Sequence, residues 1–329
     1  YPGQPQVTNT YDWVGNKTSL PGSEYNAADQ LTTMTGHTYA YDGRGNMTSD
    51  NGTSYTYTPA NLLATAGSSS MTWDAAGNRI TFTSSTDTSN PYTFVYDPTA
   101  GIPAIIEEAH AGTSTYYVRE PGGALIARVS GIDIKYYGFD DLGSTLFLTD
   151  STGIVTDKYT YDAWGNSTSH TGSTQQPYRY VGRLGYYSHY QDSSFSPLQL
   201  GVRFYNRVDG RFGQRDPIKN NGNHYFYVQN RPTWLSDPDG RIAGRYREIC
   251  NSDCSRKGLC GKIQCWLCKK IVDKTCSLGR DECCTADKGA CTNDCDKRYT
   301  SNDARIACYA TCSALYDKCL LDGKAFELP

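Results

Sequence analysis

Polar and apolar side chains alternate with a period of two through most of the first 230 residues. Typical stretches are Asn78-Arg79-Ile80-Thr81-Phe82-Thr83 and Lys158-Tyr159-Thr160-Tyr161. This alternation predicts β-strands with one apolar and one polar face. We therefore expect curved antiparallel sheet over most of residues 8 to 230, and no helix longer than three turns before Cys250.

A six-residue phrase, Tyr-Asp-x-x-Gly-Asn, recurs between these strands. It stands at residues 11–16, 41–46 and 161–166, and with Trp in place of Tyr at 73–78. Asp can accept backbone hydrogen bonds at the start of a turn, Gly supplies a positive φ, and Asn tolerates the left-handed region. Each phrase therefore predicts a turn between two strands. We interpret its Tyr and Asp as structural residues and predict no metal site and no cofactor.

Composition changes sharply at Cys250. All 13 cysteines lie from Cys250 to Cys319, whereas all five histidines lie at or before His224. Dense cysteine without histidine favours a disulfide framework over zinc, and hence a secreted or cell-surface location. The net charge of −3 argues against nucleic acid as a partner of the whole chain. No apolar stretch is long enough to span a membrane, and the chain starts without Met, so we expect it to be part of a longer protein.

After residue 135 the repeats continue into several ordered motifs. These are Tyr137-Gly138-Phe139-Asp140-Asp141-Leu142-Gly143-Ser144, Tyr178-Arg179-Tyr180-Val181-Gly182-Arg183, Asp216-Pro217-Ile218 and Asp237-Pro238-Asp239-Gly240. Together with the turn phrases they resemble the RHS/YD-repeat family, which includes bacterial polymorphic toxins, insecticidal toxin complexes and teneurins. The resemblance covers about 230 residues and ends after Ile242. It implies YD repeats over 1–135, an RHS repeat-associated core over 136–240 and a variable Cys-rich domain over 241–329.

The resemblance also implies a fold and a function. The fold is mainly β: antiparallel hairpins wind into a spiral shell closed by the associated core, and a small α-helical, disulfide-rich tail follows. The function is that of the C-terminal part of a secreted toxin-like protein, whose shell encloses a variable effector. Its expected partner is the remainder of its own longer chain, with self-assembly or a target-cell surface as further possibilities. The alternative function is an extracellular structural, adhesive or filament-forming protein with an uncleaved Cys-rich cap.

Two Asp-Pro motifs are the candidate chemistry. Asp216 and Asp237 bracket a strand-like segment that can bring them together, and we expect their carboxylates within about 6 Å of each other. Two carboxylates that share a proton can activate water and protonate a leaving amide. The resemblance implies a self-cleaving aspartyl protease made by this pair, with Arg211 or Arg215 orienting a carboxylate.

The implied cut lies near Gly240, Arg241 and Ile242, just after the second motif. Lys219 and Arg241 depart from the family pattern, which has Gly and Leu at these positions. The alternative interpretation makes both motifs turn initiators, in which Asp caps its own turn and Pro fixes φ.

Cysteine spacing makes a separate prediction for the tail. Three cysteines spaced i, i+7, i+11 and three spaced i, i+4, i+11 each lie on one helix face, and the two spacings are mirror images. Paired positions in an antiparallel hairpin have a constant index sum, which predicts three disulfides between two helices. They are Cys284–Cys319, Cys291–Cys312 and Cys295–Cys308, with Cys283 as an alternative to Cys284.

The same tail faintly resembles secreted phospholipases A2 around Cys283-Cys284. Asp287 and Lys288 stand where those enzymes carry a catalytic His and a calcium-binding Asp, so we do not predict an active lipase. A cationic disulfide-bonded hairpin that acts on a membrane or a receptor, and an inert structural cap, both stay open.

Overall fold

The computed structural model describes residues 8–100, 102, 104–218 and 222–241. The chain divides into two units, Tyr1–Ile249 and Cys250–Pro329, and the described residues all belong to the first. The predicted tail disulfides and Ile242 lie outside the described residues.

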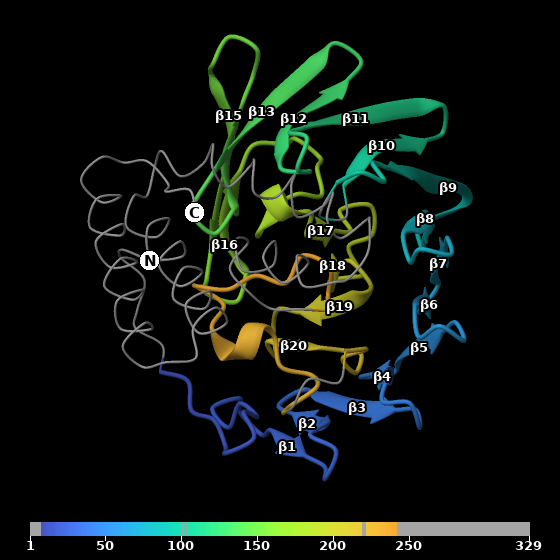
Figure 1. The fold of residues 1–329 in the computed structure, drawn as a ribbon, viewed down its shortest axis with the longest axis vertical. Helices are drawn as coiled ribbons and strands as arrows, with labels where there is room; N and C mark the ends of the chain where they lie inside the picture. The colour runs from blue at the N-terminus through green and yellow to red at the C-terminus, as the bar shows by residue number, and fades with distance from the viewer. Residues whose placement is uncertain (1–7, 101, 103, 219–221, 242–329) are drawn as a thin grey trace, which may run out of the picture. The chain divides into compact units, whose positions relative to one another are not determined.

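Antiparallel sheet dominates the described part of the chain, as the alternation predicts. One sheet of 16 strands is hydrogen-bonded in chain order, and a second sheet of four strands follows it. The long sheet bends around the short one (Figure 1). Helix occurs within residues 8 to 241 only as two three-residue 3₁₀ turns, η1 (Gly182–Leu184) and η2 (Val228–Asn230).

The strands of the long sheet are β1 (Glu24–Tyr25), β2 (Leu31–Met34), β3 (His37–Tyr41), β4 (Met47–Asp50), β5 (Thr53–Tyr57), β6 (Leu63–Ala66), β7 (Ser69–Trp73), β8 (Arg79–Ser84), β9 (Asp87–Tyr96), β10 (Ile105–His110), β11 (Thr113–Arg119), β12 (Leu125–Ser130), β13 (Asp133–Phe139), β14 (Thr145–Thr149), β15 (Val155–Tyr161) and β16 (Ser167–Thr171). The strands of the short sheet are β17 (Tyr187–Ser188), β18 (Leu198–Leu200), β19 (Arg203–Asn206) and β20 (Arg211–Phe212).

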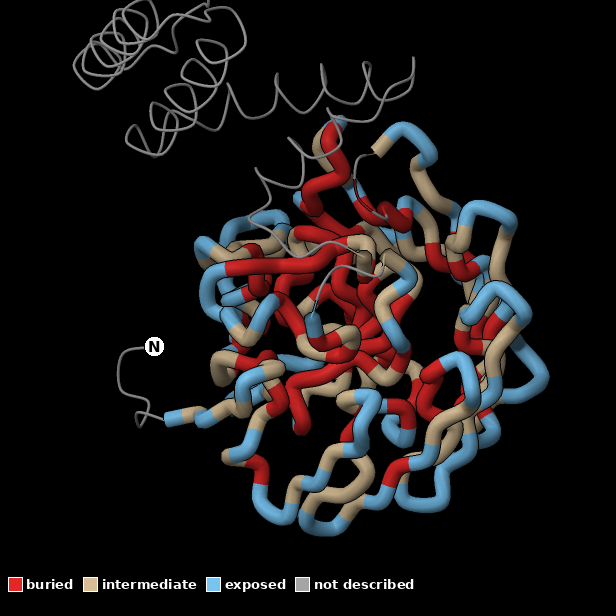
Figure 2. The backbone as a smooth tube through the Cα atoms, turned by 60° about the horizontal axis from the view of Figure 1, so that its bottom comes forward, coloured by how far each residue is buried: buried red, intermediate tan, exposed pale blue. Residues whose placement is uncertain are grey.

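The core lies between the two sheets. Phe82 and Leu63 of the long sheet are buried against Phe195 and Phe204 of the inner segment, which is the part of the chain that follows β16 and contains the short sheet. The buried positions gather in the interior of this unit, with exposed turns around it (Figure 2). On the opposite face of β5 and β6, the hydroxyls of Thr56 and Thr65 are 2.6 Å apart. This part of the sheet therefore has the one apolar and one polar face that the alternation predicts.

Each repeated phrase folds as a turn built on its own Asp. At Asp74, Oδ1 accepts the backbone N–H of Ala76 at 2.9 Å and of Asn78 at 2.8 Å, while Oδ2 accepts the Asn78 amide at 2.9 Å. The same pattern recurs at Asp12, Asp42 and Asp162. These local hydrogen bonds explain why the phrase predicts the turns correctly.

The aromatic residue of the repeat holds neighbouring strands together. Tyr41 donates its hydroxyl to the Leu31 carbonyl at 3.0 Å, and Trp73 donates its ring N–H to the Leu63 carbonyl at 2.7 Å. Each ring therefore satisfies a carbonyl ten residues earlier in the chain. This contact gives the repeated Tyr a structural role.

Several of the turn glycines also contact the inner segment. An added Cβ at Gly165 would lie 2.5 Å from the Tyr180 ring, and one at Gly45 would lie 2.5 Å from the Tyr225 hydroxyl. Gly is thus required at these turns by close packing as well as by a positive φ.

Gly165→Ala should destabilise the protein more than Gly52→Ala. The φ values are nearly equal, +90° and +88°, but an added methyl at Gly52 meets nothing within 4 Å. Both variants carry the cost of about 1–2 kcal/mol for a left-handed residue, and Gly165→Ala adds overpacking of about 1–3 kcal/mol. Urea unfolding of both variants measures the difference. Equal loss of stability would show that Tyr180 does not require glycine at 165.

Candidate functional site

The second Asp-Pro motif is held against the β18–β19 turn. An added Cβ at Gly201 would collide with the Asp239 backbone, and one at Gly240 would collide with the Leu200 carbonyl. Gly240 also has a φ of +65°. Both positions therefore need glycine, and their close approach brings residues 237–241 alongside β19.

Arg203 of β19 links the two predicted aspartates. Its Nη2 lies 3.5 Å from Asp216 Oδ2 and 3.0 Å from Asp237 Oδ2. The guanidinium is buried and lies over the Phe212 ring, 3.6 Å from the ring centroid. One nitrogen of Arg203 thus contacts a carboxylate from each Asp-Pro motif.

The Gly240–Arg241 peptide bond contacts the same groups at both ends. Arg203 Nε donates to the Gly240 carbonyl at 2.5 Å, and the Arg241 N–H donates to Asp237 Oδ1 at 2.9 Å. A cation therefore faces the carbonyl oxygen, and a carboxyl group faces the amide nitrogen. This bond lies within the stretch from Gly240 to Ile242 near which the sequence resemblance places the cut.

The Asp237 turn shares part of the hydrogen bonding of a repeat turn, although its own N–H donates to the Tyr186 hydroxyl at 2.6 Å, whereas that of Asp74 donates to the Asn78 carbonyl. Asp237 Oδ1 accepts the backbone N–H four residues later, as Asp74 does, and the Gly240 N–H donates to the Asp237 carbonyl at 3.3 Å. In the repeat turns Oδ2 accepts the Asn amide. At Asp237 that position is Arg241, and Oδ2 contacts Arg203 instead.

Burial separates Asp237 from the repeat aspartates. At Asp74 the desolvation that raises the pKa is outweighed by hydrogen bonds from Asn78, so the pKa lies below its ordinary value. Asp237 is 1% exposed, and burial raises its pKa to about 7. Arg203 opposes this rise in pKa, and Asp239 adds to it through its charge and a hydrogen bond. Asp237 can therefore hold a proton near neutral pH.

Asp216 is placed by its own motif. Its N–H donates to the His224 carbonyl at 3.1 Å, and its Oδ1 accepts the Ile218 N–H at 2.8 Å. Its side chain is 16% exposed, against 1% for Asp237. The two aspartates of the predicted pair therefore occupy unequal environments.

The two arginines singled out from the sequence lie elsewhere. Arg211 donates to Asn16 Oδ1 at 3.1 Å and to Asn223 Oδ1 at 3.3 Å, and its Nη2 also donates to the Asp29 carbonyl. Arg215 is exposed and lies beside Gly45. The ion pairs of Asp216 and Asp237 come from Arg203, which sequence reasoning missed.

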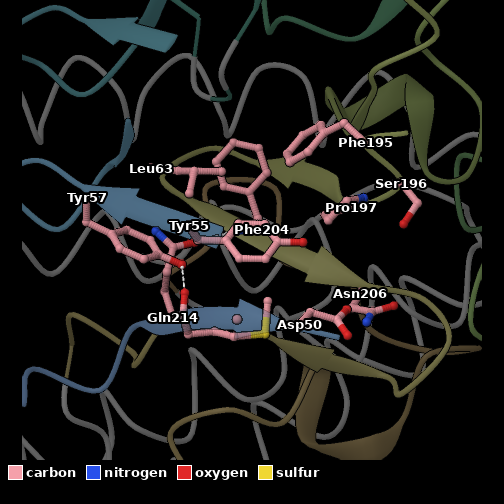
Figure 3. A pocket seen from close by; sticks show the side chains of 12 residues that line it. Asp50, Tyr55, Tyr57, Leu63, Phe195, Ser196, Pro197, Phe204, Asn206 and Gln214 are labelled. Atoms are coloured by element: carbon pink, nitrogen blue, oxygen red, sulfur yellow. Dashed lines mark hydrogen bonds between the residues drawn. The ribbon is translucent and has the colours of Figure 1, made fainter. Parts of the chain in front are cut away.

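A small cavity elsewhere in the core carries no comparable chemistry. It has a volume of about 30 Å³, with Asp50 and Asn206 on one side and Tyr57 on the other (Figure 3). Asp50 is already paired with His37 Nδ1 at 2.7 Å. Among the described residues, no group of three or more His, Cys, Asp or Glu side chains is arranged to hold a metal ion.

Comparison with known proteins agrees with the repeat pattern. The Teneurin YD-shell family model matches residues 2–231. The tRNA3(Ser)-specific nuclease WapA of Bacillus spizizenii is 28% identical over 261 residues, which is 71% of this chain and 11% of that protein. Double-stranded DNA deaminase toxin A of Burkholderia cenocepacia is 31% identical over 158 residues, 46% of this chain and 10% of that protein. The chain therefore spans about a tenth of the length of these relatives.

A solved structure is also similar. The Photorhabdus luminescens Tc holotoxin pore matches 67% of this chain and 11% of its own, with 19% identity and a TM-score of 0.45. In the described part of this chain, no helix has the length and apolar character of a membrane span. The family model covers more than half of the sequence, including the four repeat phrases and the first Asp-Pro motif, and it ends before the second motif at Asp237–Gly240. The chain belongs to the Teneurin YD-shell family of RHS/YD-repeat proteins.

Proposed function

We propose that this chain is the C-terminal shell-and-core part of a secreted, toxin-like RHS-repeat protein that cuts its own backbone near Gly240–Ile242. The cut would free the Cys-rich segment that follows, as an effector. Two relatives are named as a tRNA nuclease and a DNA deaminase toxin, which supports a toxin-like role for this chain. The remainder of the longer chain would complete the shell and is the expected partner.

The arrangement around Gly240–Arg241 is the observation that carries this proposal. Cleavage of an amide needs stabilisation of the negative charge on the carbonyl oxygen and a proton for the leaving nitrogen. Arg203 Nε supplies the first at 2.5 Å, and Asp237, with a pKa of about 7, supplies the second at 2.9 Å. Asp216 is the second carboxylate on Arg203 and helps to hold the guanidinium in place.

The intact mass of the purified chain tests the proposal. We expect two fragments that meet within residues 240–242, and an uncut chain for Asp237→Asn, because Asn cannot donate a carboxyl proton. Asp74→Asn is the matched control: it removes the carboxylate from a repeat turn in which Oδ1 likewise accepts the N–H four residues later, away from this bond, and should leave the cut unchanged. An unbroken wild-type chain would contradict self-cleavage.

The turn geometry favours a second candidate function. Because the Asp237 turn shares the Oδ1 and glycine hydrogen bonds of the structural turns, Asp237 and Arg203 could serve only to hold the chain against β19. The protein would then be an uncleaved extracellular structural or adhesive YD-repeat protein. A single mass equal to the full chain would favour this candidate.

A further inference from the structure

The first repeat turn contacts the associated core through a buried asparagine. Asn16 closes this turn, since its amide donates to Asp12 Oδ2 at 2.9 Å and to Asp29 Oδ1 at 3.1 Å. Its side-chain oxygen accepts hydrogen bonds from Asn223 Nδ2 at 2.6 Å and from Arg211 Nη1 at 3.1 Å. Asn16 therefore joins the beginning of the repeats to a segment 207 residues later in the chain.

A second repeat turn holds a neighbouring side chain of the same segment. Tyr225 donates its hydroxyl to the Gly45 carbonyl at 2.9 Å, and this hydroxyl accepts the Gln30 amide at 2.9 Å. Within the segment, Asn223 Oδ1 also accepts the Tyr225 N–H at 3.0 Å. The side chains on either side of His224 are therefore both anchored to the repeats.

The backbone carbonyl between these two anchors contacts the proposed cleavage site. The His224 carbonyl accepts the Asp216 N–H at 3.1 Å and Arg203 Nη1 at 3.4 Å. The other two nitrogens of that guanidinium contact the Gly240 carbonyl and the carboxylates of Asp216 and Asp237. One carbonyl thus helps to place the first Asp-Pro motif and the cation that faces the Gly240–Arg241 bond.

We propose that the repeat turns at 11–16 and 41–46 regulate the self-cleavage, with Asn16, Asn223 and Tyr225 as positioning residues. This inference rests on the proposed self-cleavage and leaves its two aspartates in their roles. When both turns are docked on the core, they fix the His224 carbonyl and the groups that it holds. Without docking the carbonyl loses its anchors, and the chain stays uncut. The Cys-rich segment is then released only after these repeats have packed on the core.

The rate of self-cleavage of the full chain, followed by intact mass during cell-free translation, tests the positioning role. Asn16→Ala and Asn223→Ala should each slow the cut about 10- to 100-fold, since a displacement of about 1 Å can cost about 100-fold in rate. The double variant should be little slower than the slower single variant, because both changes remove one shared contact. Tyr225→Phe loses only a hydroxyl and should slow the cut by a smaller factor.

Asn166→Ala is the matched control. The Asn166 amide donates to Asp162 Oδ2 at 2.8 Å and to the Arg207 carbonyl at 3.1 Å. Its replacement therefore removes the same closure of a repeat turn and one contact between a turn and the core. Neither acceptor lies in the segment 223–225. Asn166→Ala should lower the free energy of unfolding in urea, and the chain should still be cut at the wild-type rate.

Hydrogen exchange measures the coupling independently of the rate. In an Asp237→Asn background, which keeps the chain uncut, Asn16→Ala should speed the exchange of the Asp216 amide. The reason is that its acceptor, the His224 carbonyl, is no longer anchored. Asn166→Ala should leave this exchange as it is in the parent. A loss of stability alone, without a change at His224, would not single out this amide.

The outcomes separate this inference from the proposed function. A cut wild-type chain with unchanged rates in folded Asn16→Ala and Asn223→Ala would overturn the regulation alone, as would equal slowing by Asn166→Ala or unchanged exchange of the Asp216 amide. Circular dichroism that matches the wild type verifies folding. If an alanine variant does not fold, a wild-type rate in Tyr225→Phe would overturn the regulation. An uncut wild-type chain would overturn both this inference and the proposed function.

Discussion

Arg203→Gln should leave the chain uncut and lower its free energy of unfolding by about 3–5 kcal/mol, the usual cost of removing one partner of a buried ion pair. The arginine is 4% exposed and contacts two carboxylates and the Gly240 carbonyl. Without it, Asp237 remains buried and loses its ion pair with Arg203. The carbonyl of the proposed scissile bond also loses its donor.

A double variant distinguishes the loss of charge balance from the loss of packing. Adding Asp237→Asn to Arg203→Gln removes the buried carboxyl group that has lost its ion pair with Arg203, and should restore part of the stability without restoring cleavage. Urea unfolding of Arg203→Gln, Asp237→Asn and the double variant measures this coupling, because all three should be uncut. Strictly additive losses would show that Arg203 does not neutralise Asp237.

Arg119→Gln is the matched control for Arg203→Gln. Arg119 also donates to two backbone carbonyls, at 2.8 Å each, and lies over the Tyr178 ring. Its contacts are with Ile105 and Gly123. Its replacement should therefore reduce stability while the chain is still cut. An uncut Arg119→Gln chain would indicate that cleavage responds to general destabilisation.

The sheet and its turns were predictable because the contacts that form them are local. Asp74 binds backbone atoms two and four residues away, and period-two alternation fixes which side chains face the core. Long-range packing of the turns was not predictable, because nothing in the phrase shows that Gly165 meets Tyr180. The same phrase therefore specifies the turn but not the surface against which it packs.

The candidate site was predictable only in part for the same reason. The two Asp-Pro motifs stand out in the sequence, whereas nothing in the sequence distinguishes Arg203 from other strand residues. Arg203 contacts Gly240 only because of the packing of β19. One signal could have pointed to it. Asp237-Pro238-Asp239-Gly240-Arg241 fits the repeat turn except that Arg replaces Asn, so its Asp lacks the usual amide donor and needs one from elsewhere.

Asp209→Asn should change how stability depends on pH. Asp209 lies between β19 and β20 and is 5% exposed. Its Oδ1 accepts the Arg211 N–H at 2.9 Å, and its Oδ2 accepts the Asn206 amide at 3.0 Å. Burial raises its pKa to about 7, against the opposing effects of the Arg211 N–H and the Arg211 charge. The folded protein therefore holds a proton on Asp209 that the unfolded chain releases near pH 4.

The sign follows from this difference in pKa. Because the folded pKa is the higher one, the contribution to stability is fully present below about pH 4 and is lost as pH rises to about 7. A shift of about three pKa units corresponds to roughly 4 kcal/mol across that window. In an Asp237→Asn background, which keeps the chain uncut and removes the other carboxyl group whose pKa burial raises to about 7, urea unfolding at pH 4.5, 6 and 8 should show this fall.

Adding Asp209→Asn should flatten the dependence of the free energy of unfolding on pH and make the protein more stable than its parent at pH 8. The gain is reduced by the loss of one hydrogen-bond acceptor, because an amide has one acceptor oxygen where the carboxyl group has two. Asp42→Asn is the control of opposite sign. The Asp42 carboxylate accepts hydrogen bonds from Asn46 that outweigh its desolvation and lower its pKa, so its contribution is present above pH 4 and lost on acidification. A stability curve for Asp209→Asn that falls as steeply as its parent's between pH 4.5 and 8 would show that Asp209 is ionised in the folded protein throughout.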